Sequence, residues 1–396
     1  MQNKIKLAAI SDCTGCAACG DVCPKRCISF DFNNTLHLYP NINEDVCIKC
    51  GKCMKTCPIL NPDDSSESDV SGRYRYFATW REDNYKRAFS TSGGAGAAIA
   101  EWGVQNGWKV CGSLFDSEWN LKHSIGTSDI FLEKIRQSKY LQSNTEGKFK
   151  EIKNLLDANE QVIFFGTPCQ IAGLLKFCGK RDTLLTVEII CHGVNSPKVW
   201  KDYVRAIEAR NNSKLSSYNF RDKSRGWERP KGGPNLTVSM NFSNGSLIIN
   251  PARYNLFHFW FGQHYMLREA CFNCRYRKKE RVGDIVIGDF WGIENILPSA
   301  DIKRGISVAI ATNTRSMNIL HMIDCVLIEV NEDKTLGVLK GFIEKRSIES
   351  RSKDIEKMKN FAKDFYSSSF EEMVGKYPAP TPLSCFIARV KNFLHR

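Results

Sequence analysis

The sequence predicts a small cysteine-rich α+β module, a larger α/β domain after it and a helical C-terminal tail. Cysteines recur at fixed spacing within the first 60 residues. From residue 73 onward, apolar segments with the periods of strands and helices alternate, which is typical of an α/β core with parallel strand pairs. Between them lies a polar, acidic segment without periodicity. We therefore expect a module at 1–60, a linker at 61–72, a domain at 73–313 and a helical region at 314–396.

Composition narrows the class of protein. The chain has 396 residues, of which 42% are hydrophobic and 25% charged, so wholesale disorder is excluded. No apolar secretory region follows Met1, and the aromatic segment Tyr254–Leu267 is interrupted by polar residues, so we expect a buried helix there. These features predict a cytoplasmic protein. In that reducing compartment the 17 cysteines are expected to bind metal, not to form disulfides.

Two cysteine motifs of the form C-x2-C-x2-C-x3-C-P dominate the N-terminal module. The first consists of Cys13, Cys16, Cys19, Cys23 and Pro24, and the second of Cys47, Cys50, Cys53, Cys57 and Pro58. In bacterial ferredoxin-like modules with two [4Fe-4S] clusters, the fourth cysteine of each motif binds the cluster of the other. The expected ligand sets are therefore Cys13, Cys16, Cys19 and Cys57 for one cluster, and Cys47, Cys50, Cys53 and Cys23 for the second. The alternative, zinc, prefers tetrahedral sites built from paired CxxC halves.

The segment between the two motifs predicts a hairpin. Ile28–Phe32 and Thr35–Tyr39 alternate in polarity around Asn33 and Asn34. His37 is then a strand residue. Cys27 falls outside both motifs, and we expect it to be a spare thiol.

The larger domain is predicted from its periodic segments. The expected strands are Tyr74–Trp80, Trp108–Phe115, Gln161–Gly166, Leu184–Ile190, Asp284–Phe290 and Ile306–Asn313, with a hairpin of Leu236–Phe242 and Ser246–Asn250. The expected helices are Ala95–Gln105, Pro168–Phe177 and Pro197–Arg210. The loop Ser90–Gly94 opens the first of these helices, so its free backbone N–H groups could bind a phosphate. Its alternative role is a simple helix cap.

Four further cysteines of the larger domain form a candidate site. Cys169 and Cys191 each follow a predicted strand of one βαβ unit, so both are expected at the carboxyl edge of the sheet. Cys271 and Cys274 form a CxxC pair that needs two more ligands. We also expect the helix start at Pro168 to lower the pKa of Cys169. A redox-active Cys271–Cys274 pair without iron and purely structural thiols are the alternatives. The remaining cysteines, Cys111, Cys178, Cys325 and Cys385, are expected to be ordinary buried thiols.

The charge of the chain suits anionic partners. The formal net charge is +13, and each [4Fe-4S] cluster with four thiolates contributes about −2, which leaves about +9 with two clusters or about +7 with three. The basic run Arg275–Arg281 is either a solvated face or, beside the CxxC pair, a site that holds an anionic cofactor or docks an acidic electron carrier. No helix-turn-helix or finger spacing accompanies this charge, so nucleic-acid binding is not expected.

Six segments taken together are similar to the coenzyme F420 hydrogenase/dehydrogenase beta-subunit family. They are Ser92–Gly94, Ser138–Ser143, Gly166–Gln170, Cys191–Gly193, Phe220–Lys223 and Gly288–Gly292, in order from about Arg73 to Thr312. The resemblance implies a flavoprotein that binds FAD beside a [4Fe-4S] cluster. It implies hydride transfer between FAD and a deazaflavin such as coenzyme F420, or another small substrate. A flavin converts two-electron hydride chemistry into the one-electron steps that clusters require.

The same resemblance implies roles for individual residues. The implied FAD contacts are Ser92, Gly93, Gly94, Ser138, Lys139, Tyr140, Gln142 and Ser143, and the implied ligands of a third cluster are Cys169, Cys191, Cys271 and Cys274. No catalytic residue is assigned. The expected partners are an electron-carrier protein or partner oxidoreductase and a small-molecule hydride acceptor.

Two functions follow from these features. The first is a flavin-dependent iron–sulfur oxidoreductase, which the long α/β domain favours because a relay needs only the first 60 residues. The second is a non-catalytic electron-relay subunit that docks on a partner oxidoreductase.

The C-terminus adds one further expectation. Phe386, Ile387, Val390, Phe393 and Leu394 share a helical face accompanied by Arg389, Lys391 and Arg396. Such a basic amphipathic helix predicts peripheral membrane contact. Docking of this helix on the protein's own core is the alternative.

Overall fold

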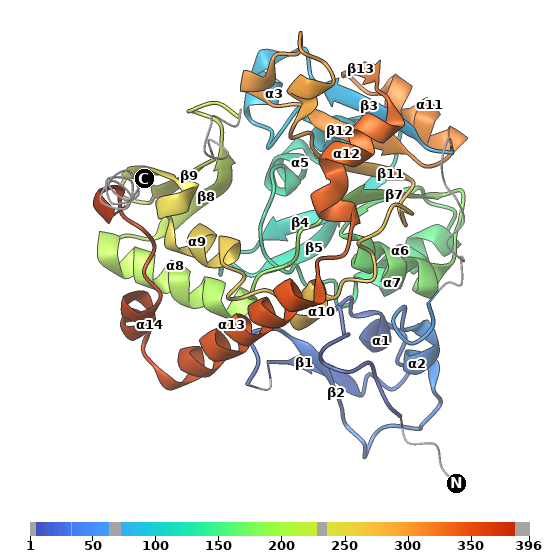
Figure 1. The fold of residues 1–396 in the computed structure, drawn as a ribbon. Helices are drawn as coiled ribbons and strands as arrows, with labels where there is room; N and C mark the ends of the chain where they lie inside the picture. The colour runs from blue at the N-terminus through green and yellow to red at the C-terminus, as the bar shows by residue number, and fades with distance from the viewer. Residues whose placement is uncertain (1–4, 33, 63–72, 228–235, 385–396) are drawn as a thin grey trace.

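The computed structural model describes residues 5–32, 34–62, 73–227 and 236–384. In these residues an eight-stranded mixed sheet forms the centre of the molecule (Figure 1). Its strand order is β13-β3-β12-β11-β7-β6-β4-β5. The bounds are β3 (Arg75–Trp80), β4 (Lys109–Phe115), β5 (Leu121–Gly126), β6 (Val162–Gly166), β7 (Leu184–Ile189), β11 (Ile285–Asp289), β12 (Ser307–Ala311) and β13 (Val326–Glu329).

Four neighbouring strands of this sheet are parallel, as the alternating pattern predicted. β4 pairs with β6, β6 with β7 and β7 with β11 in parallel, so their carboxyl ends meet at one edge. The outer strands β5, β12, β3 and β13 pair antiparallel. The larger domain is therefore α/β at its centre and mixed at its flanks.

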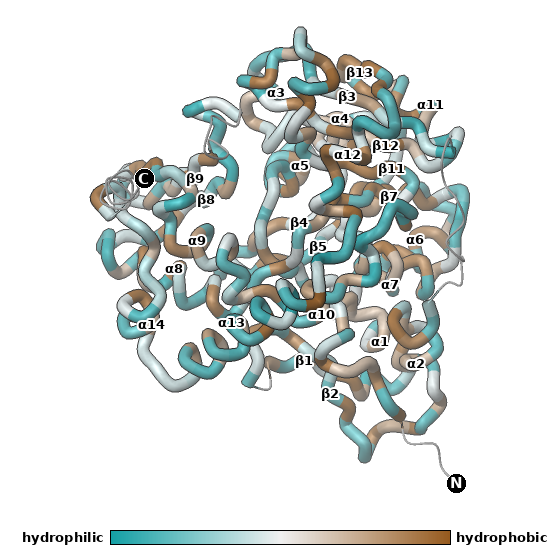
Figure 2. The backbone as a smooth tube through the Cα atoms, in the orientation of Figure 1, coloured by the Kyte–Doolittle hydropathy of each residue, from teal (hydrophilic) through white to brown (hydrophobic). Residues whose placement is uncertain are grey.

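Helices surround this sheet. They are α3 (Asn84–Ala88), α4 (Ala95–Gln105), α5 (Asp129–Ile135), α6 (Lys148–Asp157), α7 (Pro168–Cys178), α11 (Thr314–Met322) and α12 (Glu332–Ile343). Helix α7 starts at Pro168 because the fixed φ of proline suits a first turn, and Thr167 and Gln170 form a capping box there. Figure 2 shows hydrophobic residues along the strands of the central sheet and along α7.

A second, smaller sheet packs beside the first with its own aromatic core. It consists of β8 (Leu215–Asp222), β9 (Thr237–Phe242) and β10 (Leu247–Pro251), all antiparallel. The helices here are α8 (Pro197–Asn211), α9 (Leu256–Gly262), α10 (Glu269–Phe272), α13 (Ile348–Ser367) and α14 (Phe370–Lys376). Three single-turn 3-10 helices, Ala252–Tyr254, Ile293–Asn295 and Ile302–Arg304, complete the described elements. Trp200, Trp260 and Phe257 are almost fully buried between this sheet and its helices.

The N-terminal module consists of α1 (Ala18–Asp21), α2 (Lys52–Thr56) and a two-stranded sheet of β1 (Ile28–Asp31) and β2 (Tyr39–Ile42). The predicted first strand is confirmed, but the second begins at Tyr39, not at Thr35. His37 is consequently not a strand residue. It is buried, with Nε2 lying 3.1 Å from the Met266 carbonyl of the larger domain.

The module is docked on the larger domain. Asp21 accepts hydrogen bonds from the backbone N–H groups of Gly147 (2.6 Å) and Phe149 (2.9 Å), and so caps helix α6, whose N-cap glycine has no side chain. The Thr145 hydroxyl donates to the Cys16 carbonyl at 2.9 Å. Figure 1 shows the module, in blue, beneath α6, α7 and α10. The linker expected at 61–72 is therefore not the only connection between the two parts.

Other expectations differ in part. The helix predicted over Tyr254–Leu267 spans only Leu256–Gly262, because a turn follows it. The region 314–384 is mostly helical, but β13 pairs with β3, so this region contributes a strand to the central sheet. Most of the predicted linker, the basic C-terminal helix and Cys385 lie outside the described residues. None of the helices among the described residues is long and apolar enough to span a membrane.

Candidate metal centres

Three groups of cysteines come together in the structure, and we call them sites 1, 2 and 3. Site 1 consists of Cys13, Cys16, Cys19 and Cys57. Burial raises the pKa of the Cys16 thiol to about 12, and the charges of Cys13 and Cys57 add to the rise. The Cys19 thiol has a raised pKa for the same reasons. The fourth cysteine of the second motif therefore lies close to the first three cysteines of the first motif.

Site 2 consists of Cys23, Cys47, Cys50 and Cys53, which line one cavity together with Cys27. Cys27, expected to be a spare thiol, belongs to this site. Its Sγ lies 3.4 Å from Sγ of Cys23, and burial followed by its bond to Cys23 raises its pKa to about 12. The two motifs therefore supply four thiols to site 2 and Cys27 a fifth, one more than a [4Fe-4S] cluster requires.

Site 3 consists of Cys169, Cys191, Cys271 and Cys274. Cys169 and Cys191 follow the parallel strands β6 and β7, and so lie at the same edge of the sheet, as predicted. Burial, together with the charge of Cys274, raises the pKa of Cys169 to about 11 and that of Cys271 to about 12. Burial also raises the pKa of Cys191 well above its ordinary value, and Cys271, Cys169 and Cys274 add to that rise.

The expected lowering of the Cys169 pKa is wrong. The thiol is at the first turn of α7, and the Thr167 hydroxyl lies 3.2 Å from its sulfur, which does favour the thiolate. Burial nevertheless outweighs these contacts and raises the pKa of Cys169 to about 11. A cationic metal centre would have to offset this penalty for the thiolate to form.

Backbone N–H groups point at the sulfurs of site 3. The Gly193 N–H donates to Cys191 and the Val194 N–H donates to Cys271. Burial raises the pKa of both thiols, and these hydrogen bonds counteract part of that rise. Those of Tyr276 and Arg277 do the same for Cys274. Hydrogen bonds to sulfur from the backbone are the contacts that stabilise cluster thiolates. Four sulfurs with such donors fit a [4Fe-4S] cluster at site 3. No group of three or more His, Cys, Asp or Glu side chains in the described ranges is arranged to hold a single metal ion.

Sites 1 and 3 are neighbours. The charge of Cys169 is among the causes that raise the pKa of Cys16 after burial. Cys16 also packs on helix α7, because a Cβ added to Gly173 would lie 2.8 Å from its Sγ. Tyr276 lies between the two sites: burial and then the charges of Cys169 and Cys16 raise its pKa. Sites 2, 1 and 3 are therefore arranged in sequence from the module into the larger domain.

The basic run beside site 3 is partly internal. The Arg281 guanidinium forms an ion pair with the fully buried Glu188, and Arg277 donates to the Gly341 carbonyl. Exposed Arg275 donates to the carbonyls of Pro58 (3.4 Å) and Ile59 (3.2 Å) in the module. Several of these cations thus bind the protein's own chain, so the run is not a wholly solvated face.

The glycine-rich loop expected to contact FAD is packed on the chain itself. The Ser92 hydroxyl donates to the Ile306 carbonyl at 2.7 Å, and the Gly93 N–H donates to Ser307 Oγ at 3.0 Å. A Cβ on Gly93 would lie 2.3 Å from the Thr79 carbonyl oxygen. Close approach to strands β3 and β12 therefore explains this glycine.

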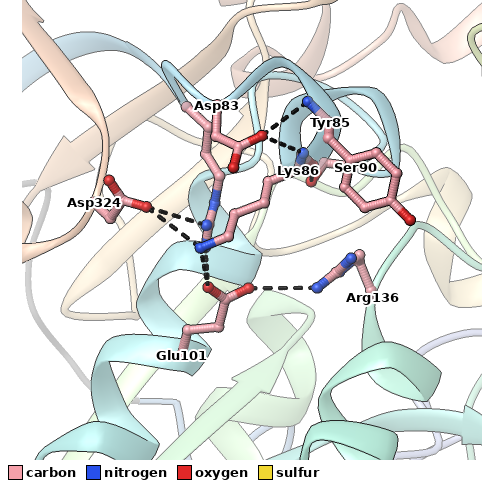
Figure 3. A network of polar contacts seen from close by, with 8 residues as sticks. Asp83, Tyr85, Lys86, Ser90, Glu101, Arg136 and Asp324 are labelled. Atoms are coloured by element: carbon pink, nitrogen blue, oxygen red, sulfur yellow. Dashed lines mark hydrogen bonds and ion pairs between the residues drawn. The ribbon is translucent and has the colours of Figure 1, made fainter.

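Cations do surround this loop, but they are already paired. Figure 3 shows the network, in which Glu101 contacts Lys86 (3.6 Å) and Arg136 (3.4 Å). Arg81, which is almost fully buried, lies 2.7 Å from Glu101 and 3.4 Å from Asp324. The Ser92 hydroxyl and the Gly93 N–H are thus engaged within the protein, and the cations of this network are already paired with carboxylates.

The second expected flavin segment is also engaged by the protein. Lys139 donates to three backbone carbonyls at the end of α5, and burial lowers its pKa to about 7. The Tyr140 hydroxyl lies 2.7 Å from Arg221 Nη1. Ser143 bonds His123, and Gln142 bonds His37 in the module. The Ser138 N–H donates to Thr91.

Sequence reasoning missed two features of these sites. Cys27 lies outside the motif, yet the β1–β2 pairing places it at site 2. Arg268, three residues before Cys271, reaches the Cys13 carbonyl at 2.6 Å and is fully buried. Its position shortly before the CxxC pair indicated that its backbone lies near site 3. No local pattern indicated that its side chain has a partner in the distant module.

Comparisons with known proteins give the relatives of the chain. Residues 12–60 match the 4Fe-4S dicluster domain, and residues 159–335 match the C terminus of the coenzyme F420 hydrogenase/dehydrogenase beta subunit. A curated relative, one of the subunits of the F(420)H(2) dehydrogenase of Methanosarcina mazei, is 25% identical over 190 residues, which are 45% of this chain and 53% of the relative. The match thus spans about half of that relative.

A solved structure is also similar. It is the F420-reducing [NiFe] hydrogenase complex from Methanosarcina barkeri, studied by xenon derivatization, and a chain of it aligns with a TM-score of 0.43 at 16% identity. The alignment covers 72% of this chain and 92% of that one.

Proposed function

Because this chain belongs to the coenzyme F420 hydrogenase/dehydrogenase beta-subunit family and carries a 4Fe-4S dicluster domain in front, we propose that it is an iron–sulfur electron-transfer subunit of an oxidoreductase. It binds three [4Fe-4S] clusters, one at each of sites 1, 2 and 3. Electrons pass singly along these sites between a carrier or partner subunit and the larger domain.

The proximity of Cys16 and Cys169 carries this proposal. Cys16 belongs to the N-terminal motif and packs on helix α7, whereas Cys169 lies in the first turn of that helix, and their charges interact. Two cysteine quartets that meet across a domain boundary are of no use to a single zinc ion, whereas one-electron transfer requires neighbouring centres. The chain's own residues hold the thiols, donate backbone N–H groups to them and exclude water from the space between them.

The finer proposal is that the larger domain also binds FAD and exchanges hydride with a coenzyme F420-like deazaflavin or another small substrate. Bound FAD would supply the change between hydride chemistry and single electrons. Support for this part comes from the family alone. The loop Ser92–Gly94, to which the resemblance assigned the flavin, has its donors satisfied by Ile306 and Ser307.

That same observation favours a second candidate, a relay subunit without a substrate site of its own. In this candidate the larger domain positions site 3 and docks on a partner oxidoreductase subunit. The name of the curated relative, a dehydrogenase subunit, agrees with an assembly of several chains.

Anaerobic purification followed by quantitation of iron and flavin tests the proposals separately. Three clusters require about twelve irons per chain and two require about eight. About twelve irons with one FAD support the flavin-dependent enzyme, and about twelve irons without flavin support the relay subunit. Stoichiometric zinc with no visible absorbance would overturn both. Reoxidation of the reduced protein by deazaflavin and by other small acceptors then identifies the substrate class.

A further inference from the structure

Arg268 is a fully buried arginine placed between sites 1 and 3. It is the residue before helix α10, which carries Cys271 of site 3. Its side chain extends into the N-terminal module, where Nε donates to the Cys13 carbonyl at 2.6 Å and Nη2 lies 3.5 Å from Cys13 Sγ. One side chain thus connects the backbone of site 3 to a sulfur of site 1.

The remaining contacts of this guanidinium are neutral. Nη1 donates to the Leu38 carbonyl at 3.0 Å and to Gln142 Oε1 at 2.8 Å, and the group lies 4.0 Å from the centre of the Tyr39 ring. No carboxylate is among the partners of Arg268 in the described part of the chain. A buried cation without an anion is costly, so its environment calls for negative charge.

We propose that Arg268 is a counter-ion shared by sites 1 and 3, which raises the reduction potentials of the clusters bound there. This inference rests on the proposed function and deepens it. Each cluster with four thiolates carries about −2 when oxidised and about −3 after it gains one electron. A nearby cation stabilises the added negative charge, so it favours the reduced form and raises the potential. Arg268 acts here as a positioning and tuning residue for sites 1 and 3.

The charge of Arg268 acts on both sites through its surroundings. Burial raises the pKa of the Cys169 and Cys271 thiols, and the charge of Arg268 counteracts part of that rise. Arg268 therefore acts on site 3 as well as on Cys13. Site 2 is different, because none of its cysteines is among the hydrogen-bond partners of Arg268 in the described residues. Site 2 therefore serves as an internal reference within the same molecule.

The test is a potentiometric titration of the full chain, with dithionite as reductant and electron paramagnetic resonance as readout. Arg268→Gln removes the charge and keeps a donor for the Cys13 carbonyl. We expect the signals of sites 1 and 3 to shift to more negative potential, while the site 2 signal stays in place. Cys274→Ala, and the double variant Cys27→Ala with Cys47→Ala, each lack one cluster and so assign the signals to sites 3 and 2.

Two further variants separate charge from structure. Arg275→Gln removes an exposed arginine that also donates to module carbonyls, and we expect wild-type potentials because solvent screens its charge. Arg268→Lys keeps the charge without the planar fork, and we expect potentials close to wild type.

The outcomes are distinct. An Arg268→Gln protein with three unshifted potentials, or an equal shift in Arg275→Gln, overturns the role of Arg268 while the proposed function stands. If Arg268→Gln does not retain iron, Arg268→Lys decides: wild-type potentials support the inference and displaced ones overturn it. A wild-type protein without iron overturns the proposed function itself.

Discussion

Arg221 and Asp289 form a buried ion pair in which Nη1 and Oδ2 are 2.7 Å apart. Arg221 is the second-last residue of strand β8 and Asp289 is the last residue of strand β11, so the pair joins the smaller sheet to the central one. Burial alone would lower the pKa of Arg221, but Asp289 and the Tyr140 hydroxyl outweigh burial and raise that pKa. Three segments that carried the family resemblance therefore meet at one polar contact.

Asp289→Asn should destabilise the protein strongly. The substitution leaves the Arg221 charge buried without an anion, which costs about 3–5 kcal/mol of unfolding free energy. Urea unfolding of wild type and variant measures the loss. The double variant Arg221→Met with Asp289→Leu removes both charges and should be less destabilised than Asp289→Asn. A single variant within about 1 kcal/mol of wild type would contradict this expectation.

Cys274→Ala should lose about four of about twelve irons, because it removes one of the four thiols of site 3. The control is Cys325→Ala, which removes a thiol of the same domain near Thr79, away from the three sites. Iron and acid-labile sulfide analysis of both proteins provides the measurement. Equal iron contents in the two variants would show that site 3 holds no cluster.

Cys23→Ala should retain most of the iron at site 2. The Sγ of Cys27 lies 3.4 Å from that of Cys23, so Cys27 is placed to take over as the fourth ligand. The double variant Cys23→Ala with Cys27→Ala should lose about four irons. Iron analysis of the single and double variants decides the point, and a full loss in the single variant would rule out Cys27 as a substitute ligand.

Gly93→Ala should lower the melting temperature and reduce both iron and any bound flavin. The added Cβ would lie 2.3 Å from the Thr79 carbonyl oxygen and 2.7 Å from the Ser307 nitrogen, so strands β3 and β12 would have to separate. Gly337→Ala is the matched control, because a Cβ there meets nothing within 4 Å in helix α12. Calorimetry of both variants should show a loss only for Gly93. If Gly93→Ala instead kept its melting temperature and its iron but lost flavin, the loop would be a flavin contact after all.

Acid should weaken the docked fold through His37. Burial, followed by the charge of Arg268, lowers the pKa of His37 to about 3 from its ordinary 6.5. Between these two values the unfolded chain binds a proton that the folded chain does not, so stability is full above about pH 6.5 and falls as the pH decreases. We expect this histidine to contribute a loss of about 1 kcal/mol per pH unit below pH 6.

Urea unfolding at pH 7.5, 6.5 and 5.5 measures this effect. His37→Gln should flatten the dependence on pH, although the buried His123 and His258 keep part of the slope. Parallel slopes for wild type and His37→Gln would exclude His37 as a source.

Local sequence patterns were sufficient to predict an element where start and stop residues mark both of its ends. Helix α4 was predicted to the residue, Ala95–Gln105, because Gly94 precedes it and Asn106 with Gly107 ends it. The parallel order of β6 and β7 also followed from one helix of suitable length between them, which correctly placed Cys169 and Cys191 at one edge.

Prediction was wrong where a distant contact decides the conformation. Thr35–Tyr39 alternates in polarity like a strand, yet the Leu36 carbonyl accepts from Ser196 at 2.5 Å and His37 bonds Met266. These partners lie more than a hundred residues away, so no local pattern indicates them. For the glycine-rich loop one requirement was not predicted: the neighbouring strands need a glycine at position 93, and a sequence does not distinguish that need from the approach of a phosphate.

The apolar cluster beneath α6 and α7 gives the docked module one more consequence. Cys16 and Ala18 of the module share that cluster with Phe149, Ile171 and Leu174 of the larger domain. If the module were removed, its surface around Cys16 would be exposed to dioxygen and bulk water. The larger domain would then have an exposed apolar patch around Phe149, Ile171 and Leu174. Each half thus covers part of the interior of the other, and we expect the separated halves to lose their clusters to dioxygen faster than the intact chain does.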